Sequence, residues 1–309
     1  MRFPDRWVED KSIELVGING LSRETPSGFF PCAAKPGALP VSLTTADRKP
    51  IELRLPRFAL SNARWLSPVL LLLLWELGSR SGVIPPRILA APSTVLGALW
   101  ELTASGELPA NLVVSLARAA AGLGIGLVVG TVLALVAGLS KVGETAVDPL
   151  MQIKRTIPSL ALTPLFIVWF GIGEAPKITL IAVATVFPIY LNLFSGIRAV
   201  DVRLIEAARS FGLSQVQQII HVILPGALPS FLVGLRYAMG VALLVLVVAE
   251  QINASAGLGH LINNARDFMR TDIIVVCLLV YAALGLAADL IVRSLEQHAL
   301  AWRPSFIKS

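Results

Sequence analysis

Six long hydrophobic stretches constrain what this chain can fold into. They cover residues 65–83, 117–139, 157–173, 178–197, 230–252 and 273–292. A helix needs about 20 mostly apolar residues to cross a bilayer, because it rises about 1.5 Å per residue. The pattern therefore predicts an all-α integral membrane protein with six transmembrane helices.

The composition agrees with this class and limits the partners. Hydrophobic residues make up 55% of the chain, charged residues 15%, and the mean hydropathy is +0.74, whereas a soluble domain is about 25% charged. The net charge of +6 is explained by the excess of Lys and Arg that membrane proteins keep in their cytoplasmic loops, so we expect no nucleic-acid partner. The two cysteines lie far apart and the three histidines lack the spacing of metal ligands, so we expect no metal site.

The first sixty residues differ from the rest of the chain. Residues 1–60 are rich in Pro, Gly, Ser and mixed charge and show no sustained periodicity. We expect them to form a poorly ordered cytoplasmic tail, which leaves residues 61–309 as the membrane domain. The first apolar run starts near Trp65, too late for a cleavable signal peptide.

The distribution of positive charge predicts the orientation of the spans. If the N-terminus is cytoplasmic, fourteen Lys and Arg residues lie on the cytoplasmic side: Arg48, Lys49, Arg54, Arg57, Arg64, Lys141, Lys154, Arg155, Arg198, Arg203, Arg209, Arg293, Arg303 and Lys308. The outer side then holds six: Arg80, Arg87, Arg118, Lys177, Arg266 and Arg270. Because Lys and Arg gather in cytoplasmic loops, we expect both termini and residues 201–229 to face the cytoplasm.

A polar segment, residues 201–236, interrupts the second half of the chain. It predicts two short helices with a break at Gly212, the second starting with a capping box between Ser214 and Gln217. Pro225 is expected to end the second helix. We interpret residues 201–225 as a helical hairpin that lies flat on the cytoplasmic face of the bilayer.

The second hydrophobic stretch carries a row of small residues. Gly122, Gly126, Gly130, Ala134 and Gly138 recur every four residues, which places them on one face of a helix. Such a face lets another helix backbone approach closely, so we expect these glycines to serve helix packing. Residues 92–104 predict a separate helix lying on the outer surface of the membrane.

Several polar or helix-kinking residues lie in the spans. Ionisable residues there are functional candidates by default, but snorkelling to the interface or structural pairing is an alternative for Arg236 and Asp289. Glu250 either caps or pairs at an outer gate. Prolines at 158, 164 and 188 kink their helices, and kinked helices line pathways. The predicted pathway or gate residues are Arg236, Glu250, Asn192 and Pro164.

The sequence shows no known catalytic motif. It lacks a Walker A sequence, HExxH, CxxC and a plausible GxSxG. We therefore expect a transport or docking protein that is not an enzyme and binds no cofactor itself. A stand-alone channel or secondary transporter remains an alternative, which predicts a dense set of charges at mid-membrane.

The polar segment also resembles a known motif. Glu206-Ala207-Ala208, Gly212 four residues on, and Leu224-Pro225 resemble the EAA motif of the membrane subunits of bacterial ABC importers. The resemblance covers about residues 60–305. The stretches TASGEL (103–108), LALTPLFIVWFGIGEAPKI (160–178), FPIYLN (187–192), HVILPGALPS (221–230) and NARDFMRTD (264–272) are similar to the nitrate/sulfonate/taurine branch of that family.

The resemblance implies a fold, partners and a function. It implies the type I (MetI-like) permease fold, multi-pass in the bacterial inner membrane. It also implies a second copy of this permease, two copies of a cytoplasmic ATPase that binds ATP and Mg, and a periplasmic or lipid-anchored binding protein. Glu206, Ala207, Ala208, Gly212, Leu224 and Pro225 would contact the ATPase. The expected substrates are aliphatic sulfonates, with taurine and nitrate as alternatives.

Overall fold

The computed structural model describes residues 57–301, with side chains from residue 66 onward except at Asn253. The predicted tail lies outside these residues apart from 57–60, as do Arg303 and Lys308 near the C-terminus. Every regular element in the described part is helical: α1 (Arg57–Arg80), α2 (Pro92–Ala104), α3 (Glu107–Leu139), α4 (Lys141–Thr156), η1 (Ser159–Leu162), α5 (Thr163–Phe170), α6 (Glu174–Arg198), α7 (Val202–Ser210), α8 (Gln215–Gln218), η2 (Ile219–Ile223), α9 (Leu224–Asn253), α10 (Leu258–Asp267) and α11 (Thr271–Ala299).

Helices α3 and α6 form a close parallel pair at the centre of the bundle. A Cβ atom at Gly122 would lie 2.6 Å from Cβ of Ile181, and one at Gly130 would lie 3.0 Å from Cβ of Ile189. The contacts advance in the same direction along both helices, so the two run parallel. The row of glycines in α3 thus allows the backbone of α6 to approach closely.

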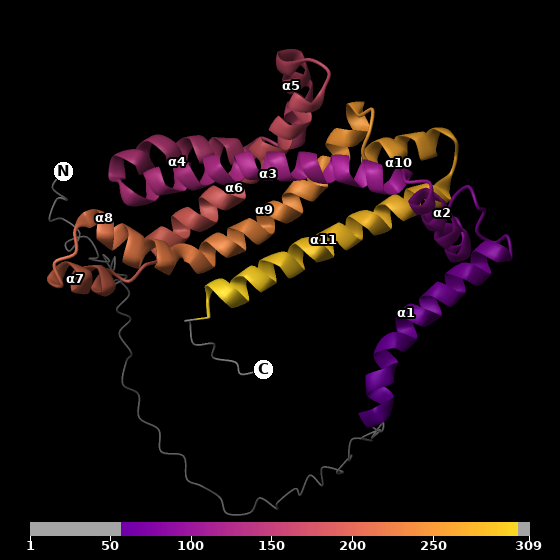
Figure 1. Cartoon of the computed structure of the whole chain (residues 1–309), viewed down its shortest axis with the longest axis horizontal. Helices are drawn as coiled ribbons and strands as arrows, with labels where there is room; N and C mark the ends of the chain where they lie inside the picture. Colours follow the sequence, from indigo (N-terminus) through magenta and orange to yellow (C-terminus); the bar gives the residue numbers. More distant parts are fainter. Residues whose placement is uncertain (1–56, 302–309) are drawn as a thin grey trace, which may run out of the picture. The chain divides into compact units, whose positions relative to one another are not determined.

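Helix α9 packs against α6 in the opposite direction. A Cβ atom at Gly196 would lie 2.6 Å from Cβ of Ser230, and one at Gly234 would lie 2.8 Å from Cβ of Asn192. Figure 1 shows α11 running beside α9, with α7 and α8 at one end of the bundle and α2 and α10 at the other. The three helices α3, α6 and α9 therefore form the core that connects the two ends.

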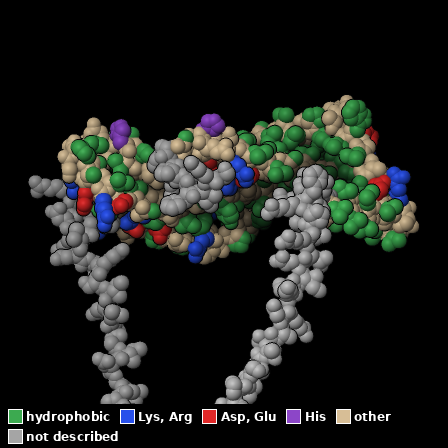
Figure 2. Space-filling view, turned by 90° about the horizontal axis from the view of Figure 1, so that it is seen from below, with side chains coloured by type: hydrophobic (Ala, Val, Ile, Leu, Met, Phe, Trp, Pro, Cys, Tyr) green, Lys and Arg blue, Asp and Glu red, His purple; other side chains and the backbone are tan. Residues whose placement is uncertain are grey.

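The hydrophobic side chains match a membrane environment. On the face drawn in Figure 2, charged side chains gather over the half that carries α7 and α8 and again at the end that carries α1 and α2, with a hydrophobic stretch between them. Leu71, Leu244 and Leu286 are each at least 66% exposed. Exposed apolar surface of this extent marks contact with lipid or with another protein chain.

The predicted number of spans is confirmed only in part. Within residues 57–301, four helices are long and apolar enough to cross a membrane, namely α3, α6, α11 and the helix Gln215–Ile252, which contains most of α9. A fifth span results if α4 and the segment Ser159–Phe170 are counted as one, although they are bent by 89°. Helix α1 is not among these, so the count of six remains a prediction.

The third predicted span, residues 157–173, is only partly helical. Its helical part, η1 and α5, covers Ser159–Phe170, and the 89° bend separates it from α4 where Pro158 follows Ile157. A residue before proline is disfavoured in the α region, and Ile157 accordingly has extended dihedral angles, φ −89° and ψ 116°. Gly171, at φ +75°, follows the last residue of α5.

The predicted loop between the second and third spans is also a helix. Helix α4 is amphipathic, and its apolar side chains Val147 and Met151 pack with α3 and α6. The Tyr190 hydroxyl donates to Asp148 Oδ1 (3.0 Å), and Lys154 Nζ lies 5.9 Å from the centre of the Phe187 ring. Helix α4 therefore runs antiparallel to α6.

The helical conformation of α4 corrects the assignment of two charges to a cytoplasmic loop. Lys154 and Arg155 lie thirteen and fourteen positions after Lys141, about 20 Å along the helix. They line a cavity together with Ala184 in the middle of α6. The charges are thus displaced from the end that carries the hairpin towards the middle of the bundle.

The surface helix expected at 92–104 is present as α2. Its residues Val95, Ala98 and Leu102 are buried in a core shared with α10 and α11, whereas Leu96 and Trp100 are exposed. Helix α2 therefore packs at the end of the bundle opposite the hairpin.

Candidate functional site

The hairpin at residues 201–225 has the break and the cap that the sequence predicts. Asp201 Oδ1 accepts a hydrogen bond from the Arg203 amide (2.9 Å) at the start of α7. Gly212 adopts φ +79°, a conformation open to glycine at little cost. Ser214 and Gln217 form a capping box, with the Ser214 amide donating to Gln217 Oε1 (2.9 Å).

Pro225 does not end the second helix, contrary to the sequence prediction. Helix α8, the π-helical turn η2 and α9 follow one another without a break. Proline lacks an N–H and its ring clashes with the carbonyl four residues earlier. The wider π turn directly before α9 accommodates this. The second arm of the hairpin is therefore continuous with a central helix of the bundle.

The hairpin exposes a mixed polar and apolar surface. Glu206 and Ala207 are exposed, whereas Ala208, expected to lie on the same contact surface, is only 6% exposed and packs inside this chain. Leu224 and Pro225 are half-buried. The exposed surface includes the large apolar side chains Val202, Leu204, Phe211, Val216 and Ile220.

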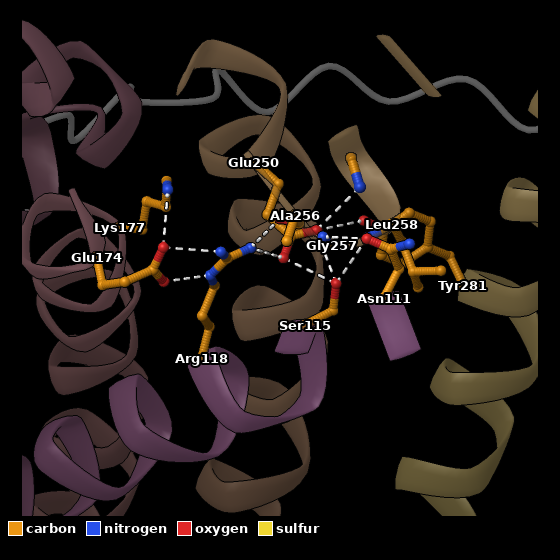
Figure 3. A network of polar contacts seen from close by, with 11 residues as sticks. Asn111, Ser115, Arg118, Glu174, Lys177, Glu250, Ala256, Gly257, Leu258 and Tyr281 are labelled. Atoms are coloured by element: carbon orange, nitrogen blue, oxygen red, sulfur yellow. Dashed lines mark hydrogen bonds and ion pairs between the residues drawn. The ribbon is translucent and has the colours of Figure 1, made fainter. Parts of the chain in front are cut away.

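A buried polar network lies at the opposite end of the bundle (Figure 3). Arg118 of α3 is 4% exposed, and its Nη1 donates to Glu250 Oε1 of α9 and to the Ala256 carbonyl, both at 2.6 Å. Its Nε and Nη2 form a two-pronged ion pair with Glu174 at the start of α6 (Nη2–Oε1 2.8 Å). Lys177 Nζ contacts the same carboxylate at 3.1 Å.

The Glu250 carboxylate is fully buried and satisfied by several donors. It accepts hydrogen bonds from Ser115 Oγ (2.7 Å), the Gly259 amide (3.0 Å) and the Tyr281 hydroxyl (3.2 Å), besides Arg118. A buried ion pair is tolerated only when its remaining hydrogen-bonding capacity is used. This network meets that condition and ties α3, α6, α9, α10 and α11 together.

The turn between α9 and α10 closes over the network. The Gly257 amide donates to Asn111 Oδ1 (2.7 Å), and the Leu258 amide donates to Ser115 Oγ (2.9 Å). Gly257 adopts φ +111°, and a Cβ atom there would lie 2.6 Å from Arg118 Nη1. Glycine is therefore required here both by the backbone conformation and by the nearby guanidinium.

The sequence prediction found one member of this network and missed its partners. Glu250 was predicted to cap or pair near an outer gate, and it does pair. Arg118 and Lys177 were counted on the outer side, but their burial was not predicted: both lie inside helices and are at most 5% exposed. The available signal was a single arginine within the apolar, glycine-rich stretch of α3, which requires a buried anion elsewhere in the chain.

The remaining predicted pathway residues do not join the network. Arg236 Nη2 pairs with Glu296 Oε2 (2.7 Å), and its Nε lies 3.3 Å from Asp289 Oδ1, so the structural-pairing alternative applies to Arg236 and Asp289. Asn192 Nδ2 donates to the Pro188 carbonyl (2.8 Å) within its own helix. Pro164 lies in the first turn of α5 and is exposed.

Comparison with known proteins identifies similar chains. Residues 126–300 match the family described as "Binding-protein-dependent transport system inner membrane component". The chain is 48% identical over 250 residues to the putative aliphatic sulfonates transport permease protein SsuC of Escherichia coli, covering 81% of this chain and 95% of that protein. It is 43% identical over 241 residues to the Bacillus subtilis protein of the same name, covering 78% and 87%.

A further relative and a solved structure are also similar to this chain. The taurine transport system permease protein TauC of E. coli is 35% identical over 237 residues, covering 75% of this chain and 86% of that one. Among solved structures, a chain of an amino acid ABC transporter superimposes with a TM-score of 0.54 at 18% identity, covering 65% of this chain and 97% of that one. At that identity the likeness concerns the fold alone.

Proposed function

Because the chain belongs to the family of binding-protein-dependent transport system inner membrane components, the permease subunits of ABC importers, we propose that it imports aliphatic sulfonates across the inner membrane. The observation that carries the substrate class is the 48% identity to a permease named for aliphatic sulfonates, over 95% of its length. The 43% identity to a second protein of that name supports the same assignment.

We propose a topology of six spans. Helix α1 is the first span, because its 24 residues would measure about 36 Å. The bent pair of α4 and α5 is the third, since α3 and α6 run parallel and the chain has to return across the membrane between them. This topology brings both termini and the hairpin to the cytoplasmic side.

The hairpin is the proposed contact with the ATPase. Its EAA residues Glu206 and Ala207 are exposed next to the apolar side chain of Phe211, which is 84% exposed. Gly212, Leu224 and Pro225 shape the hairpin and do not themselves make the main contact. Two ATPase copies would bind ATP and Mg, a second copy of this permease would complete the pathway, and a separate binding protein would deliver the substrate.

The buried polar network is the proposed closure of the outer end. It lies at the end of α3, α6 and α9 opposite the hairpin, and it joins five helices through Arg118 and Glu250. Such a closure keeps small solutes from leaking when the permease is open to the cytoplasm. It has to loosen in part when the permease opens outward.

Growth on a sulfonate as the only sulfur source tests the proposal. The chain is expressed with its ATPase and binding protein in a bacterium that lacks its own sulfonate permease. Glu206→Lys and Gly212→Pro should abolish growth on ethanesulfonate, although both variants reach the membrane at wild-type levels. The control variant Arg266→Gln, at the other end of the bundle, should grow normally, as should every strain on sulfate.

The same assay separates the alternatives. Taurine is favoured as a second substrate by the 35% identity to a taurine permease, and competition with unlabelled taurine or nitrate ranks the three anions. A stand-alone channel or secondary transporter predicts uptake without the ATPase. Uptake that persists after deletion of the ATPase would therefore contradict the proposed function.

A further inference from the structure

A cavity of about 380 Å³ lies beside the bend between α4 and η1, against the middle of α6 and α9. Its polar lining comprises Lys154, Arg155, Ser159 and Tyr237, and its apolar lining includes Phe187 and Val241. These α6 and α9 positions lie near the midpoints of helices that span the membrane. Ionisable residues at such depth are candidates for a substrate pathway.

The two cations in this cavity lack a carboxylate partner. Lys154 Nζ contacts Ser159 Oγ at 3.5 Å and the face of Phe187, and neither Lys154 nor Arg155 has an ion pair with any side chain between residues 66 and 301. Two other basic residues within the long helices differ in this respect: Arg118 and Arg236 each pair with two carboxylates.

Two adjacent unpaired cations favour an anionic ligand. Lys154 is half-buried and Arg155 is exposed at the cavity wall, and positive charge at membrane depth is costly unless an anion neutralises it. Lys154 and Arg155 together present several N–H donors, and Arg can hold an oxyanion through two of them. The hydroxyl of Ser159 adds a further donor beside Lys154.

The apolar part of the lining favours an anion that is attached to an apolar group. Phe187 and Val241 offer hydrophobic surface from α6 and α9 next to the cations. The volume is at the lower end of the range for small-molecule sites, about 300–1,000 Å³. A compact ligand with an oxyanion head and a short apolar tail fits this combination of charge, surface and size.

We propose that this cavity is a transit site inside the membrane domain, where Lys154 and Arg155 hold the sulfonate group and Phe187 and Val241 contact the alkyl chain. The proposal rests on the proposed function and adds the site at which the permease itself recognises its substrate. Removing the charge of Lys154 or Arg155 should therefore lower transport of all sulfonates. Narrowing the apolar part of the cavity should lower transport of long-chain sulfonates most.

The test uses the full permease–ATPase complex in proteoliposomes of phosphatidylcholine, with loaded binding protein on one side of the bilayer and ATP on the other. Lys154→Gln and Arg155→Gln should each lower the kcat/KM of ethanesulfonate transport about tenfold or more, the effect of losing a charged hydrogen bond. Arg155→Lys should recover part of the loss. Arg87→Gln, which removes an exposed cation outside the cavity, should transport like the wild type.

A second variant tests the site without touching its charges. Val241→Phe fills the apolar part, so octanesulfonate transport should fall at least several-fold more than methanesulfonate transport. Equal transport of both chain lengths, together with wild-type rates for Lys154→Gln and Arg155→Gln, would overturn the proposal while leaving the proposed function intact. Absence of sulfonate transport by the wild-type complex would overturn both.

An anionic lipid headgroup could bind the same two cations. Varying the lipid composition of the membrane distinguishes lipid binding from sulfonate binding. If the charge variants fail only when phosphatidylglycerol is added, and match the wild type in pure phosphatidylcholine, the cations bind lipid and the proposal is wrong. A defect that is the same in both lipid mixtures supports the transit site.

Discussion

Arg118 and Glu250, 132 positions apart in the sequence, form an ion pair in which Nη1 and Oε1 are 2.6 Å apart and neither side chain exceeds 4% exposure. The pair joins α3 to the end of α9. Around it, the Ser115 and Tyr281 hydroxyls and the amide of Gly259 use the remaining capacity of the carboxylate.

Removing one partner of this pair should destabilise the fold strongly. Glu250→Leu leaves the Arg118 guanidinium with a single carboxylate partner, Glu174, and should lower the free energy of unfolding by about 3–5 kcal/mol. Thermal unfolding of the purified protein in detergent measures the effect.

The double variant distinguishes charge from packing. Arg118→Met combined with Glu250→Leu should be more stable than Glu250→Leu alone, because the buried guanidinium that has lost its Glu250 partner is removed as well. Arg266→Gln breaks only an exposed pair with Asp267 and should change stability by less than about 1 kcal/mol. A Glu250→Leu variant as stable as this control would contradict the role of the network.

The parallel pair α3–α6 should depend on glycine at one position and not at its neighbour. A side chain at Gly122 would meet Ile181 at 2.6 Å, whereas one at Gly124 would have no neighbour within 4 Å. We expect Gly122→Val to cost about 1–3 kcal/mol or more through overpacking, and Gly124→Val to be nearly neutral. Unfolding in detergent compares the two variants, and equal effects would show that the close approach does not matter.

The π turn before α9 should set the orientation of the hairpin. Pro225→Ala restores an N–H and removes the ring clash, so η2 should relax to regular α-helical geometry and rotate α8 relative to α9. We expect fewer sulfonate molecules transported per ATP hydrolysed, measured in proteoliposomes that contain the ATPase.

The matched control is Pro229→Ala, which lies within α9 beyond the π turn. It should leave the ratio of transport to hydrolysis unchanged. A similar change in both variants would attribute the effect to a general loosening of α9.

The exposed apolar part of the hairpin should contribute to ATPase binding. Phe211 is 84% exposed in this chain, and burying such a side chain contributes about 1.5–3 kcal/mol. Phe211→Ala should therefore raise the Kd for the ATPase about tenfold to a hundredfold. Binding of the ATPase to permease embedded in nanodiscs measures this change. Val83→Ala, at an equally exposed position near α2 (79%), should bind like the wild type.

Local patterns predicted much of the secondary structure. The hydrophobic stretches located α3, α6, α9 and α11, and the capping residues located the start of α8, because these signals depend on nearby residues only. The failures arose where the tertiary environment decides. The charges of α4 suggested a loop, although its apolar face packs on α3 and α6. The helix that contains Pro225 continues through a π turn, which no local sequence pattern predicts.

Only one residue of the buried network, Glu250, was predicted from the sequence as a pairing residue. Glu250 is conspicuous because it follows a long apolar run, but its partner Arg118 lies near the end of a span, where an outer loop explains a cation equally well. Their pairing depends on α9 running antiparallel to α6 and therefore to α3, which brings the C-terminal end of α9 to the N-terminal end of α3. Charge counting along the sequence contains no information about that arrangement.

The continuity of α8, η2 and α9 has a mechanical consequence. One helix of 38 residues, Gln215–Ile252, spans about 57 Å. It continues from the hairpin at one end (Figure 1) and carries Glu250 near the other. It can act as a rigid lever, because no loop intervenes to absorb the motion. A tilt imposed on the hairpin would therefore reach Glu250, the carboxylate of the proposed outer closure, and the two sites would move together.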